Sequence, residues 1–289
     1  MNSKAFVFFG TDAFSAVVLA ELKKAGFLPA RVVTAPDRPK GRGLALTPPP
    51  AKLWAIENSV PVLQPERLDS AVAGQLSKVN SSLFVVASYG AILPKEILAI
   101  PKHGTLNVHP SLLPKYRGAS PIESAILADD RDTGVSIMLM DEQMDHGPIV
   151  ALERIQDSGF RIQEWPPSAS VLKAECARIG GELLAKTIPL WLAGKIQAVP
   201  QDHAKATYTK KIKKEDGLIR LADDPYKNFL KIRAFDGSIG TFFFTERNGK
   251  KLRVAIKDAK FAEGALTLTR VVPEGRKEMS YDAFLQGLH

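Results

Sequence analysis

The sequence predicts an α/β protein in which a doubly wound, mostly parallel sheet is followed by a small β-rich domain. In the first two thirds of the chain, short apolar runs alternate with helix-compatible segments, which is the pattern of stacked βαβ units. In the last third, several short strand-like runs are separated by turn residues, with one helix among them. A length of 289 residues is also long for a single core, which favours two domains.

The chain opens with a βαβ unit. Residues 5–9 form an apolar run that enters a turn at Gly10, residues 14–25 are helix-compatible, and residues 31–34 form the second predicted strand. A lone glycine after the first strand is weak evidence for dinucleotide binding, because no G-x-G-x-x-G pattern follows it. The unit therefore predicts the fold and leaves the ligand open.

The alternation continues to about residue 186. The predicted elements are a helix over 52–58, strand 60–62, helix 71–79, strand 83–87, strand 106–109, helix 121–127, strand 134–140 and helix 168–186. In open α/β sheets, ligands bind outside the carboxyl ends of the strands. Gly10, Tyr89, His109 and Asp145 all fall at the carboxyl ends of predicted strands, so we expect the site at that edge.

The apolar spacing in the helix over 168–186 predicts one buried face, with Leu172, Cys176, Ile179 and Leu183 at i, i+4, i+7 and i+11. Cys176 is therefore expected to pack rather than to act as a nucleophile. As the one cysteine of the chain it cannot form an internal disulfide, which fits the cytoplasm. The apolar run at 5–9 is too short for a signal sequence or a membrane span, so no membrane partner is expected.

The predicted domains are 1–189, a linker over 190–205 that contains Gly194 and Pro200, and 206–289. The last of these has a predicted helix over 228–234 and strands over 241–245, 252–257 and 266–272, which suits a small barrel. Residues 201–289 hold 18 Lys and Arg against 12 Asp and Glu, so they carry +6 of the net charge of +8. This excess favours a polyanionic partner, although a solvated lysine-rich surface would look the same.

The strongest chemical signal is the segment from Asn107 to Gly118, which directly follows an apolar strand. Asn107 can donate through its carboxamide and His109 can transfer a proton near neutral pH. One residue separates them, so on an extended backbone they point to the same face. Taken alone, an Asn-x-His pair is more often a local hydrogen-bonded pair than a catalytic one.

A second segment, 138–147, ends an apolar strand in acidic residues and Gly147. Its Asp145 is the candidate carboxylate that would orient His109 and stabilise its cationic form. The five histidines are scattered and the single cysteine cannot complete a thiolate site, so we expect no metal.

Residues 36–50 contain five prolines, two glycines and the cations Arg38, Lys40 and Arg42. This composition predicts an exposed loop with no regular structure. Without further evidence, such a loop is more often a plain surface connection than a binding element.

Together these motifs resemble those of the folate-dependent formyltransferases. The resemblance rests on Asn107-x-His109-Pro-Ser-Leu-Leu-Pro-x-Tyr-Arg-Gly118 and, about thirty residues later, on an Asp just before His-Gly. Within the family, the sequence is most similar to the branch that acts on methionyl-tRNA, because it also carries the basic loop at 36–50 and a C-terminal module with Tyr208-Thr-Lys-Lys-Ile212.

The resemblance implies a Rossmann-like formyltransferase domain and a C-terminal module of the OB type. It implies formyl transfer from 10-formyltetrahydrofolate to initiator methionyl-tRNA, with Asn107, His109 and Asp145 as catalytic residues. The implied folate contacts are Tyr89, Gly90, Ile92, Leu93, Ser111, Leu112, Leu113, Pro114 and Met140. The implied tRNA contacts are Arg38, Lys40, Arg42, Lys210 and Lys211. From the residues alone, Ile92 and Leu93 would be core residues, and Arg117 and Gly118 would support the loop.

Two other functions fit part of the pattern. A sugar-nucleotide N-formyltransferase shares the Asn, His and Asp set and can carry a similar second module. A non-catalytic RNA-binding protein on a formyltransferase scaffold is the alternative from another class, although the intact set argues against it. A glycinamide ribonucleotide formyltransferase fits less well, because that family lacks the second domain.

We expect the protein to be a monomer.

Overall fold

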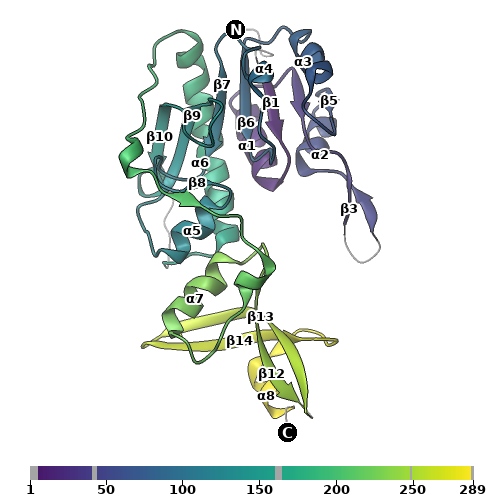
Figure 1. Cartoon of the computed structure of the whole chain (residues 1–289), viewed down its shortest axis with the longest axis vertical. Coiled ribbons are helices and arrows are strands. Elements are labelled where there is room, and N and C mark those ends of the chain that lie inside the picture. The colour runs from purple at the N-terminus through teal and green to yellow at the C-terminus, as the bar shows by residue number, and fades with distance from the viewer. Residues whose placement is uncertain (1–5, 41–43, 160–164, 248, 288–289) are drawn as a thin grey trace. The chain divides into compact units, whose positions relative to one another are not determined.

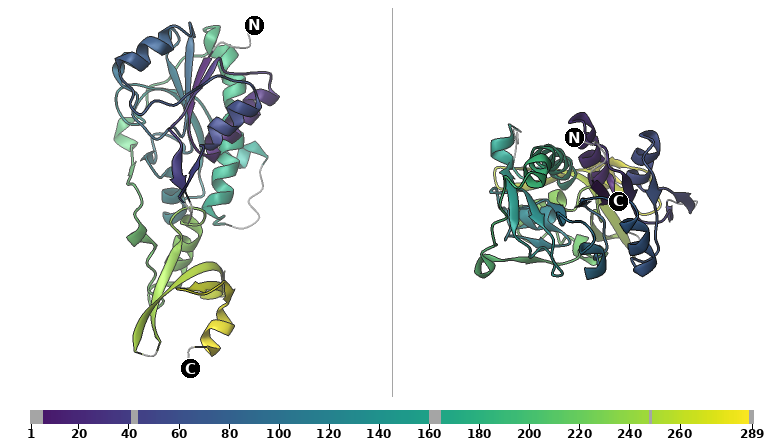
Figure 2. Two further views of the ribbon diagram at one scale, coloured as in Figure 1. Left: turned by 90° about the vertical axis from the view of Figure 1, so that its right-hand side faces the viewer. Right: turned by 90° about the horizontal axis from the view of Figure 1, so that it is seen from above.

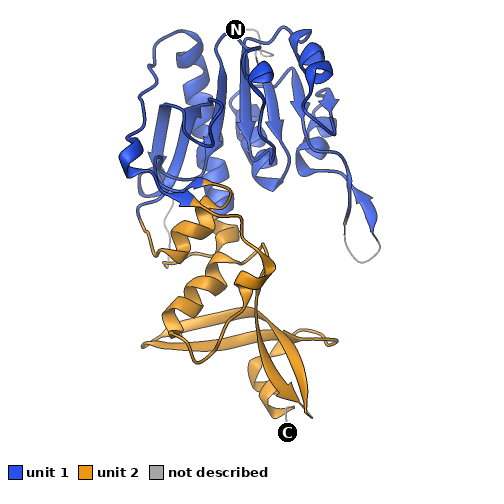
Figure 3. Cartoon of the chain, viewed as in Figure 1, with its two compact units in different colours: residues 1–117, 132–160, 173–208 blue, residues 118–131, 161–172, 209–289 orange. Residues whose placement is uncertain are grey.

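The computed structural model describes residues 6–40, 44–159, 165–247 and 249–287. The chain forms two compact units (Figure 3). Unit 1 comprises residues 1–117, 132–160 and 173–208, and unit 2 comprises residues 118–131, 161–172 and 209–289. In the described part of the chain, no helix is long and apolar enough to cross a membrane.

Unit 1 is built on a seven-stranded sheet in the order β10-β9-β7-β6-β1-β2-β5 (Figure 1). The neighbours from β5 to β7 are parallel, whereas β9 is antiparallel to both β7 and β10. The bounds are β1 Phe6–Gly10, β2 Arg31–Val33, β5 Val62–Leu63, β6 Leu83–Ala87, β7 Thr105–His109, β9 Gly134–Leu139 and β10 Ile149–Arg154. The prediction of a mostly parallel α/β sheet is confirmed.

The central strands are buried along their whole length. Every residue of β1, β6 and β7 is buried, which explains the nearly continuous apolar sequences of β1 and β6, whereas β7 also buries the polar residues Thr105, Asn107 and His109. Helices lie on both faces of the sheet (Figure 2). They are α1 Ala13–Lys24, α2 Pro50–Glu57, α3 Ser70–Ser77, α4 Lys95–Leu98 and α6 Ala169–Leu192, whose residues from 173 onward belong to unit 1.

The helix starts follow from local chemistry. Asp12 caps α1 by accepting a hydrogen bond from the Ser15 amide at 3.3 Å, and it also pairs with Lys173 of α6 at 2.6 Å. Asp69 caps α3 in the same way through the Val72 amide. On one face of the sheet, α3 and α4 pack with strand residues into a shared core. Its buried members are Val7, Phe9, Val33, Val72, Ala73, Leu76, Phe84, Val86, Tyr89, Leu93 and Ile97.

Three parts of unit 1 differ from the sequence prediction. Strand β10 was not predicted, because only one of its six residues is buried. Helix α6 continues through Pro189 to Leu192, which is compatible with a proline in the last turn, where only one helical hydrogen bond is lost. The prediction of no regular structure over 36–50 is wrong for the described residues.

Within that segment, β3 (Arg38–Lys40) and β4 (Ala45–Thr47) form an antiparallel pair that projects from the sheet of unit 1 (Figure 1). Pro39 faces Leu46 in this pairing, and a proline is tolerated there because a two-stranded ribbon leaves each strand with a free edge. Arg42, with Gly41 and Gly43, lies outside the described residues.

Unit 2 contains a four-stranded antiparallel sheet in the order β12-β13-β14-β15. Its elements are α5 Pro121–Leu127, η3 Lys214–Gly217, α7 Pro225–Ala234, β12 Thr241–Arg247, β13 Lys250–Ala262, β14 Ala265–Pro273, β15 Met279–Ser280 and α8 Tyr281–Gln286. The core lies between this sheet and its helices, and it includes Ile232 of α7, Val254 of β13 and Phe284 of α8. Strand β15 and helix α8 were not predicted. Short elements complete the chain: β8 Arg117–Gly118 with β11 Tyr208–Thr209, and 3₁₀ turns at Ile155–Ser158 and His203–Lys205.

Two adjacent glycines let α6 approach the sheet and α1 closely. A Cβ on Gly180 would lie 2.5 Å from Val108 Cγ1 of β7, and one on Gly181 would lie 2.6 Å from Glu21 Cβ of α1. Both distances are too short for carbon atoms in contact. Val108 is β-branched and buried, so it cannot move aside easily. Helix α6 can therefore pack directly against β7 because Gly180 and Gly181 have no side chains.

Gly180→Ala should lower the free energy of unfolding, because overpacking costs about 1–3 kcal/mol and exceeds the roughly 1 kcal/mol that alanine gains in helix propensity. Gly74→Ala is the matched control in α3, where a Cβ would meet nothing within 4 Å. It should raise the free energy of unfolding by about 0.5–1 kcal/mol. Chemical denaturation of the two variants measures both effects, and a shift of the same sign in both would contradict the packing argument.

Candidate active site

Strand β7 directs Asn107 and His109 to one face of the sheet. Val108, between them, points towards α6, as its closeness to Gly180 shows. Since side chains alternate along a strand, Asn107 and His109 point to the opposite face, where α3, α4 and Tyr89 pack. Both are buried, with 8% of Asn107 and 4% of His109 exposed.

His109 lies between a backbone carbonyl and a carboxylate. Its Nε2 is 3.0 Å from the Tyr116 carbonyl oxygen, and because a carbonyl only accepts, Nε2 must carry the hydrogen in this contact. Its Nδ1 lies 3.6 Å from Asp145 Oδ1, which is close enough for an ion pair but too long for a hydrogen bond. The ring orientation is thus fixed at Nε2, while Nδ1 keeps room for another partner.

Asp145 reaches His109 by a route that the sequence did not predict. Because β9 is antiparallel to β7, with Leu139 opposite Leu106, the carboxyl end of β9 lies near the start of β7, away from His109. The expectation that β9 delivers Asp145 to this edge as a parallel strand is therefore wrong, although the carboxylate does lie beside His109 at the carboxyl end of β7. The segment after β9 instead runs back along the sheet, and it includes a left-handed backbone at Asp145 with φ of 49°. Gly147 is required in this turn, since a Cβ there would lie 1.8 Å from the Leu139 carbonyl oxygen.

The Asn107 carboxamide makes no hydrogen bond to any described residue. This differs from the alternative of a satisfied local Asn-x-His pair, in which the two side chains would bond to each other or to nearby backbone. The Asn107 carboxamide is also absent from the fully buried side-chain atoms that lack a partner, so its polar atoms keep some access from outside. The carboxamide is therefore available to a substrate.

The loop after His109 is anchored by Ser136 of β9. The Ser136 hydroxyl donates to the Ser111 carbonyl oxygen at 2.7 Å and accepts from the Leu113 amide at 3.0 Å. Ser111 is fully buried and donates from Oγ to the Lys115 carbonyl oxygen at 2.6 Å. Sequence analysis missed Ser136, although a serine in the middle of an otherwise apolar buried strand is a signal that could have found it.

The predicted folate-binding residues lie on two loops and in the core beneath them. Leu112 and Leu113 are buried and Pro114 is half-buried. In the other loop, Ile92 is 78% exposed, whereas Leu93 is 2% exposed and belongs to the core, as does the packed side chain of Met140.

Tyr89 is held firmly in that second loop. Its ring packs edge-on against Phe9 at 5.5 Å, and its carbonyl oxygen accepts from Thr11 Oγ1 at 2.9 Å. Burial raises the pKa of the Tyr89 phenol, so the side chain is a neutral donor at pH 7. Gly90 takes φ of 85° and closes the turn.

The predicted tRNA-binding residues divide between the units. Arg38 of unit 1 is exposed and lies 3.3 Å from the exposed carboxylate of Glu66. Lys40 ends β3. Lys210 and Lys211 of unit 2 are exposed, and Arg42 lies outside the described residues.

Two other features bear on the kind of chemistry that the chain can support. Cys176 is fully buried, and burial raises the pKa of its thiol to about 12, which excludes a thiolate nucleophile at neutral pH. Among the described residues, no three His, Cys, Asp or Glu side chains are grouped to hold a metal ion.

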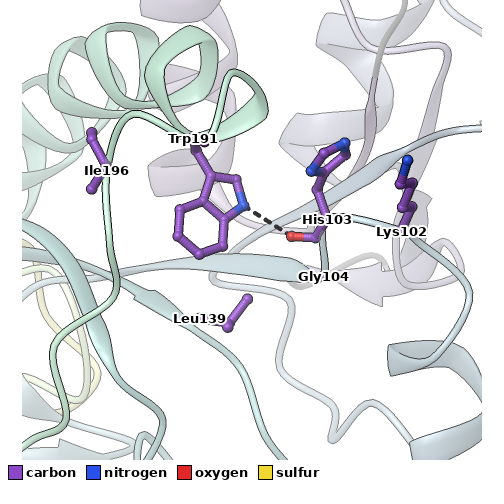
Figure 4. A pocket seen from close by; sticks show the side chains of 7 residues that line it. Lys102, His103, Gly104, Leu139, Trp191 and Ile196 are labelled. Atoms are coloured by element: carbon purple, nitrogen blue, oxygen red, sulfur yellow. Dashed lines mark hydrogen bonds between the residues drawn. The ribbon is translucent and has the colours of Figure 1, made fainter.

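A cavity of about 340 Å³ lies at the start of β7, at the opposite end of the strand from His109 (Figure 4). Trp191 forms one wall and donates from Nε1 to the His103 carbonyl oxygen at 2.9 Å. The lining residues are Lys102, His103, Gly104, Leu139, Trp191, Gly194 and Ile196. None of the predicted site residues is among them, so this cavity is separate from the candidate site.

Comparison with known proteins identifies close relatives. The formyl transferase family matches residues 3–156. A methionyl-tRNA formyltransferase from Chloroflexus aurantiacus is 40% identical over 98% of this chain and 96% of its own length. The solved methionyl-tRNA formyltransferase of Clostridium thermocellum has a TM-score of 0.63 at 17% identity, and the alignment covers 93% of this chain and 98% of that one. The N-formyltransferase of Helicobacter canadensis, solved with folinic acid and dTDP-3-aminofucose, has a TM-score of 0.62 at 18% identity and covers 96% and 98%. These structural likenesses establish the fold alone, whereas the 40% identity over nearly the full chain establishes the family.

Ser136→Ala should free the loop at 111–113. The buried Leu113 amide would lose its acceptor, which costs about 1–3 kcal/mol of unfolding free energy, and its hydrogen exchange should accelerate. Ser77→Ala is the control, because that hydroxyl only donates to the Ala73 carbonyl oxygen inside α3. It should change the unfolding free energy by less than about 0.5 kcal/mol. Unchanged exchange at Leu113 in the Ser136 variant would show that the hydroxyl does not hold this loop.

Proposed function

The chain belongs to the methionyl-tRNA formyltransferase family, and from this we propose how its residues carry the reaction. The protein transfers a formyl group to the amino group of methionyl-tRNA. The donor is a folate derivative, which we assign as 10-formyltetrahydrofolate, and the acceptor as the initiator methionyl-tRNA. The observation that best supports the assignment of the site is His109, held between the Tyr116 carbonyl and Asp145 beside an Asn107 carboxamide that no described residue satisfies.

Formyl transfer is an acyl transfer. The methionyl amine attacks the formyl carbon, the carbonyl oxygen becomes an oxyanion, and collapse breaks the bond to the folate nitrogen. The amine loses a proton and the leaving nitrogen gains one. We assign the oxyanion to the Asn107 carboxamide and the proton transfer to His109 Nδ1. Asp145 stabilises His109 when the imidazole is protonated.

Folate binding is assigned to the two loops on the Asn107 face. Ile92 is exposed at the tip of its loop and is suited to direct contact with an apolar ring, whereas Tyr89, Gly90 and Leu93 hold that loop in place. We assign the other side of the folate site to the segment from Ser111 to Pro114, which Ser136 anchors. Met140 packs against the core beneath the site.

Binding of the tRNA is assigned to two basic elements. The ribbon of β3 and β4 presents Leu44 and Leu46, each 71% exposed, in the segment that also carries the cations Arg38, Lys40 and Arg42. Exposed apolar side chains near cations suit unpaired bases beside phosphates. In unit 2, we propose that the antiparallel sheet belongs to an OB-like domain over residues 206–289 and that Lys210 and Lys211 contact the tRNA.

The outer face of β12 and β13 supports this assignment. Phe243 points into the core of unit 2, so its neighbours Phe242 and Phe244 point outward. Lys251 Nζ lies 4.0 Å above the Phe244 ring, and Arg253 lies 3.9 Å above the Phe242 ring. Aromatic faces beside cations bind bases and phosphates together. A sugar nucleotide would not need such a surface, and that alternative is not better supported.

His109→Ala and Asp145→Asn should each lower kcat by about two to four powers of ten, because each removes part of one proton-transferring pair. For the same reason, the double variant should lose far less than the product of the two effects. Single-turnover formylation of methionyl-tRNA measures this. Asp132→Asn, which removes a surface ion pair with Arg154, should leave kcat unchanged. Near-normal turnover in a folded His109 or Asp145 variant would refute these roles.

Changes on the aromatic face should separate phosphate from base contacts. Lys251→Gln and Arg253→Gln should each flatten the dependence of log affinity for tRNA on log salt by about 0.7–0.9. Phe244→Leu should weaken binding at every salt concentration by about 1–3 kcal/mol without changing the slope. Arg270→Gln is the control, because its charge is already paired with Asp258 and Glu278. Equal slopes in all four variants would place the tRNA elsewhere.

A further inference from the structure

We propose that Gln201 is a positioning residue for catalysis: held by the buried Arg117, it fixes the backbone around Asp145 and so sets the carboxylate against His109. The proposal rests on the assignment of His109 and Asp145 given above. Gln201 lies between α6 and β11, in the predicted linker and outside every motif of the sequence analysis, and its side chain touches no reacting group.

The side-chain amide of Gln201 uses both of its donor hydrogens and both acceptor positions of its oxygen. Its Nε2 donates to the Asp145 carbonyl oxygen at 2.9 Å and to the Gly147 carbonyl oxygen at 2.7 Å. Its Oε1 accepts from Arg117 Nε at 3.1 Å and Nη2 at 2.7 Å. Carbonyls only accept and a guanidinium only donates, so the amide can lie in just one orientation. Only 5% of the surface of Gln201 is exposed, so solvent has little access to replace these bonds.

Arg117 is the largest side chain that is almost fully buried, at 1% exposed. Its remaining donors face His203 and Tyr208, with Nη2 2.9 Å from His203 Nδ1 and Nη1 3.3 Å from the Tyr208 hydroxyl. Among the described residues, no carboxylate forms an ion pair with it. A buried cation without a carboxylate partner is a weak source of stability. Arg117 contributes more to the geometry of the site than to stability. It directly follows Tyr116, whose carbonyl oxygen accepts from His109 Nε2.

One guanidinium therefore connects both sides of the His109 ring. On one side the chain passes from Arg117 to Tyr116, which has a left-handed backbone with φ of 60°. On the other side the path runs through Gln201 to the backbone of Asp145, also left-handed. Non-glycine residues in this conformation are strained and persist only where their surroundings hold them. The two bonds from Gln201 supply that restraint on both sides of residue 146.

Two neighbouring histidines further restrain the loop at 145–147. His146 bonds to Asp141 through Nδ1 at 2.6 Å, and its ring stacks on His203 at 4.2 Å. His203 is in turn a partner of Arg117. The side chain of residue 146 is thus fixed on the Arg117 side. Since Asp145 is 3.6 Å from Nδ1, a small displacement of this loop would decide whether the carboxylate still acts on the ring.

The test uses two substitutions that separate the two sides of the amide. Gln201→Leu removes all four bonds. Gln201→Glu still accepts from Arg117 but cannot donate to the Asp145 and Gly147 carbonyls. If the donation to these carbonyls matters, both variants should lower kcat by about 10- to 100-fold, as expected for a misplaced catalytic group. KM for the folate donor and for methionyl-tRNA should stay within about threefold of wild type.

A double variant provides the second readout. In the Asp145→Asn background, Gln201→Glu should lower kcat no further, because a residue that acts through Asp145 has nothing left to position. Asn58→Leu is the control, since it removes an amide bond to the Trp54 carbonyl oxygen at the end of α2, and it should leave kcat unchanged. Thermal melting establishes that each variant is folded.

Wild-type kcat in Gln201→Glu would overturn the proposal and leave Gln201 as a partner of Arg117 only. Equal losses from Gln201→Glu in the wild-type and the Asp145→Asn backgrounds would also overturn it, because the effect would not pass through Asp145. A wild-type protein that does not formylate methionyl-tRNA would instead refute the proposed function. Faster hydrogen exchange at 145–147 in Gln201→Glu, measured without substrate, is expected whether or not the wild-type protein formylates methionyl-tRNA.

Discussion

The packing of Val108 against Gly180 is the constraint on which the rest of unit 1 depends. It seats α6 directly on β7 and determines which face of that strand is sealed. Because strand side chains alternate, sealing Val108 leaves Asn107 and His109 no choice of direction. They open onto the face where α3, α4 and the Tyr89 loop pack. A shift of one residue in this strand would bury the imidazole under a helix and expose a valine, so the packing of the core and the placement of the site have a single origin.

The remaining geometry of the site comes from loops that are held by buried polar side chains. The segment after β7 is fixed by Ser136, and the segment before β10 by Gln201. In each case a side chain satisfies backbone groups that no sheet or helix would satisfy, which is the condition for burying an irregular backbone. The left-handed residues Tyr116 and Asp145 lie in these loops, where their strain is stabilised by the surrounding bonds.

Much of the fold was predictable, because a fully buried strand shows in the sequence as a continuous apolar run. Residues 83–87 are such a run, and β6 has those bounds. The direction of β9 was not predictable, since an apolar run has the same composition in a parallel or an antiparallel pair. The ribbon of β3 and β4 was missed because its prolines and glycines resemble those of a loop. At the site, Asn107, His109 and Asp145 could be found from their chemistry, and the structure places His109 beside Asp145. Ser136 stands out as a polar residue in a buried strand, but neither it nor Gln201 could be assigned a role, because the groups they bond lie in distant segments of the chain.

This distinction bears on how the chemistry depends on the fold. The reactive groups are short-range features of the sequence, but the separation of Nδ1 from Oδ1 is set by contacts that join residues 117, 136, 145 and 201. A carboxylate 3.6 Å from an imidazole nitrogen lies just outside hydrogen-bond range, so a displacement of well under 1 Å would either create a hydrogen bond or break the ion pair. Thermal motion of a free loop exceeds this distance. The motif therefore supplies the groups, and the buried amide and hydroxyl supply the precision that makes them act as one unit.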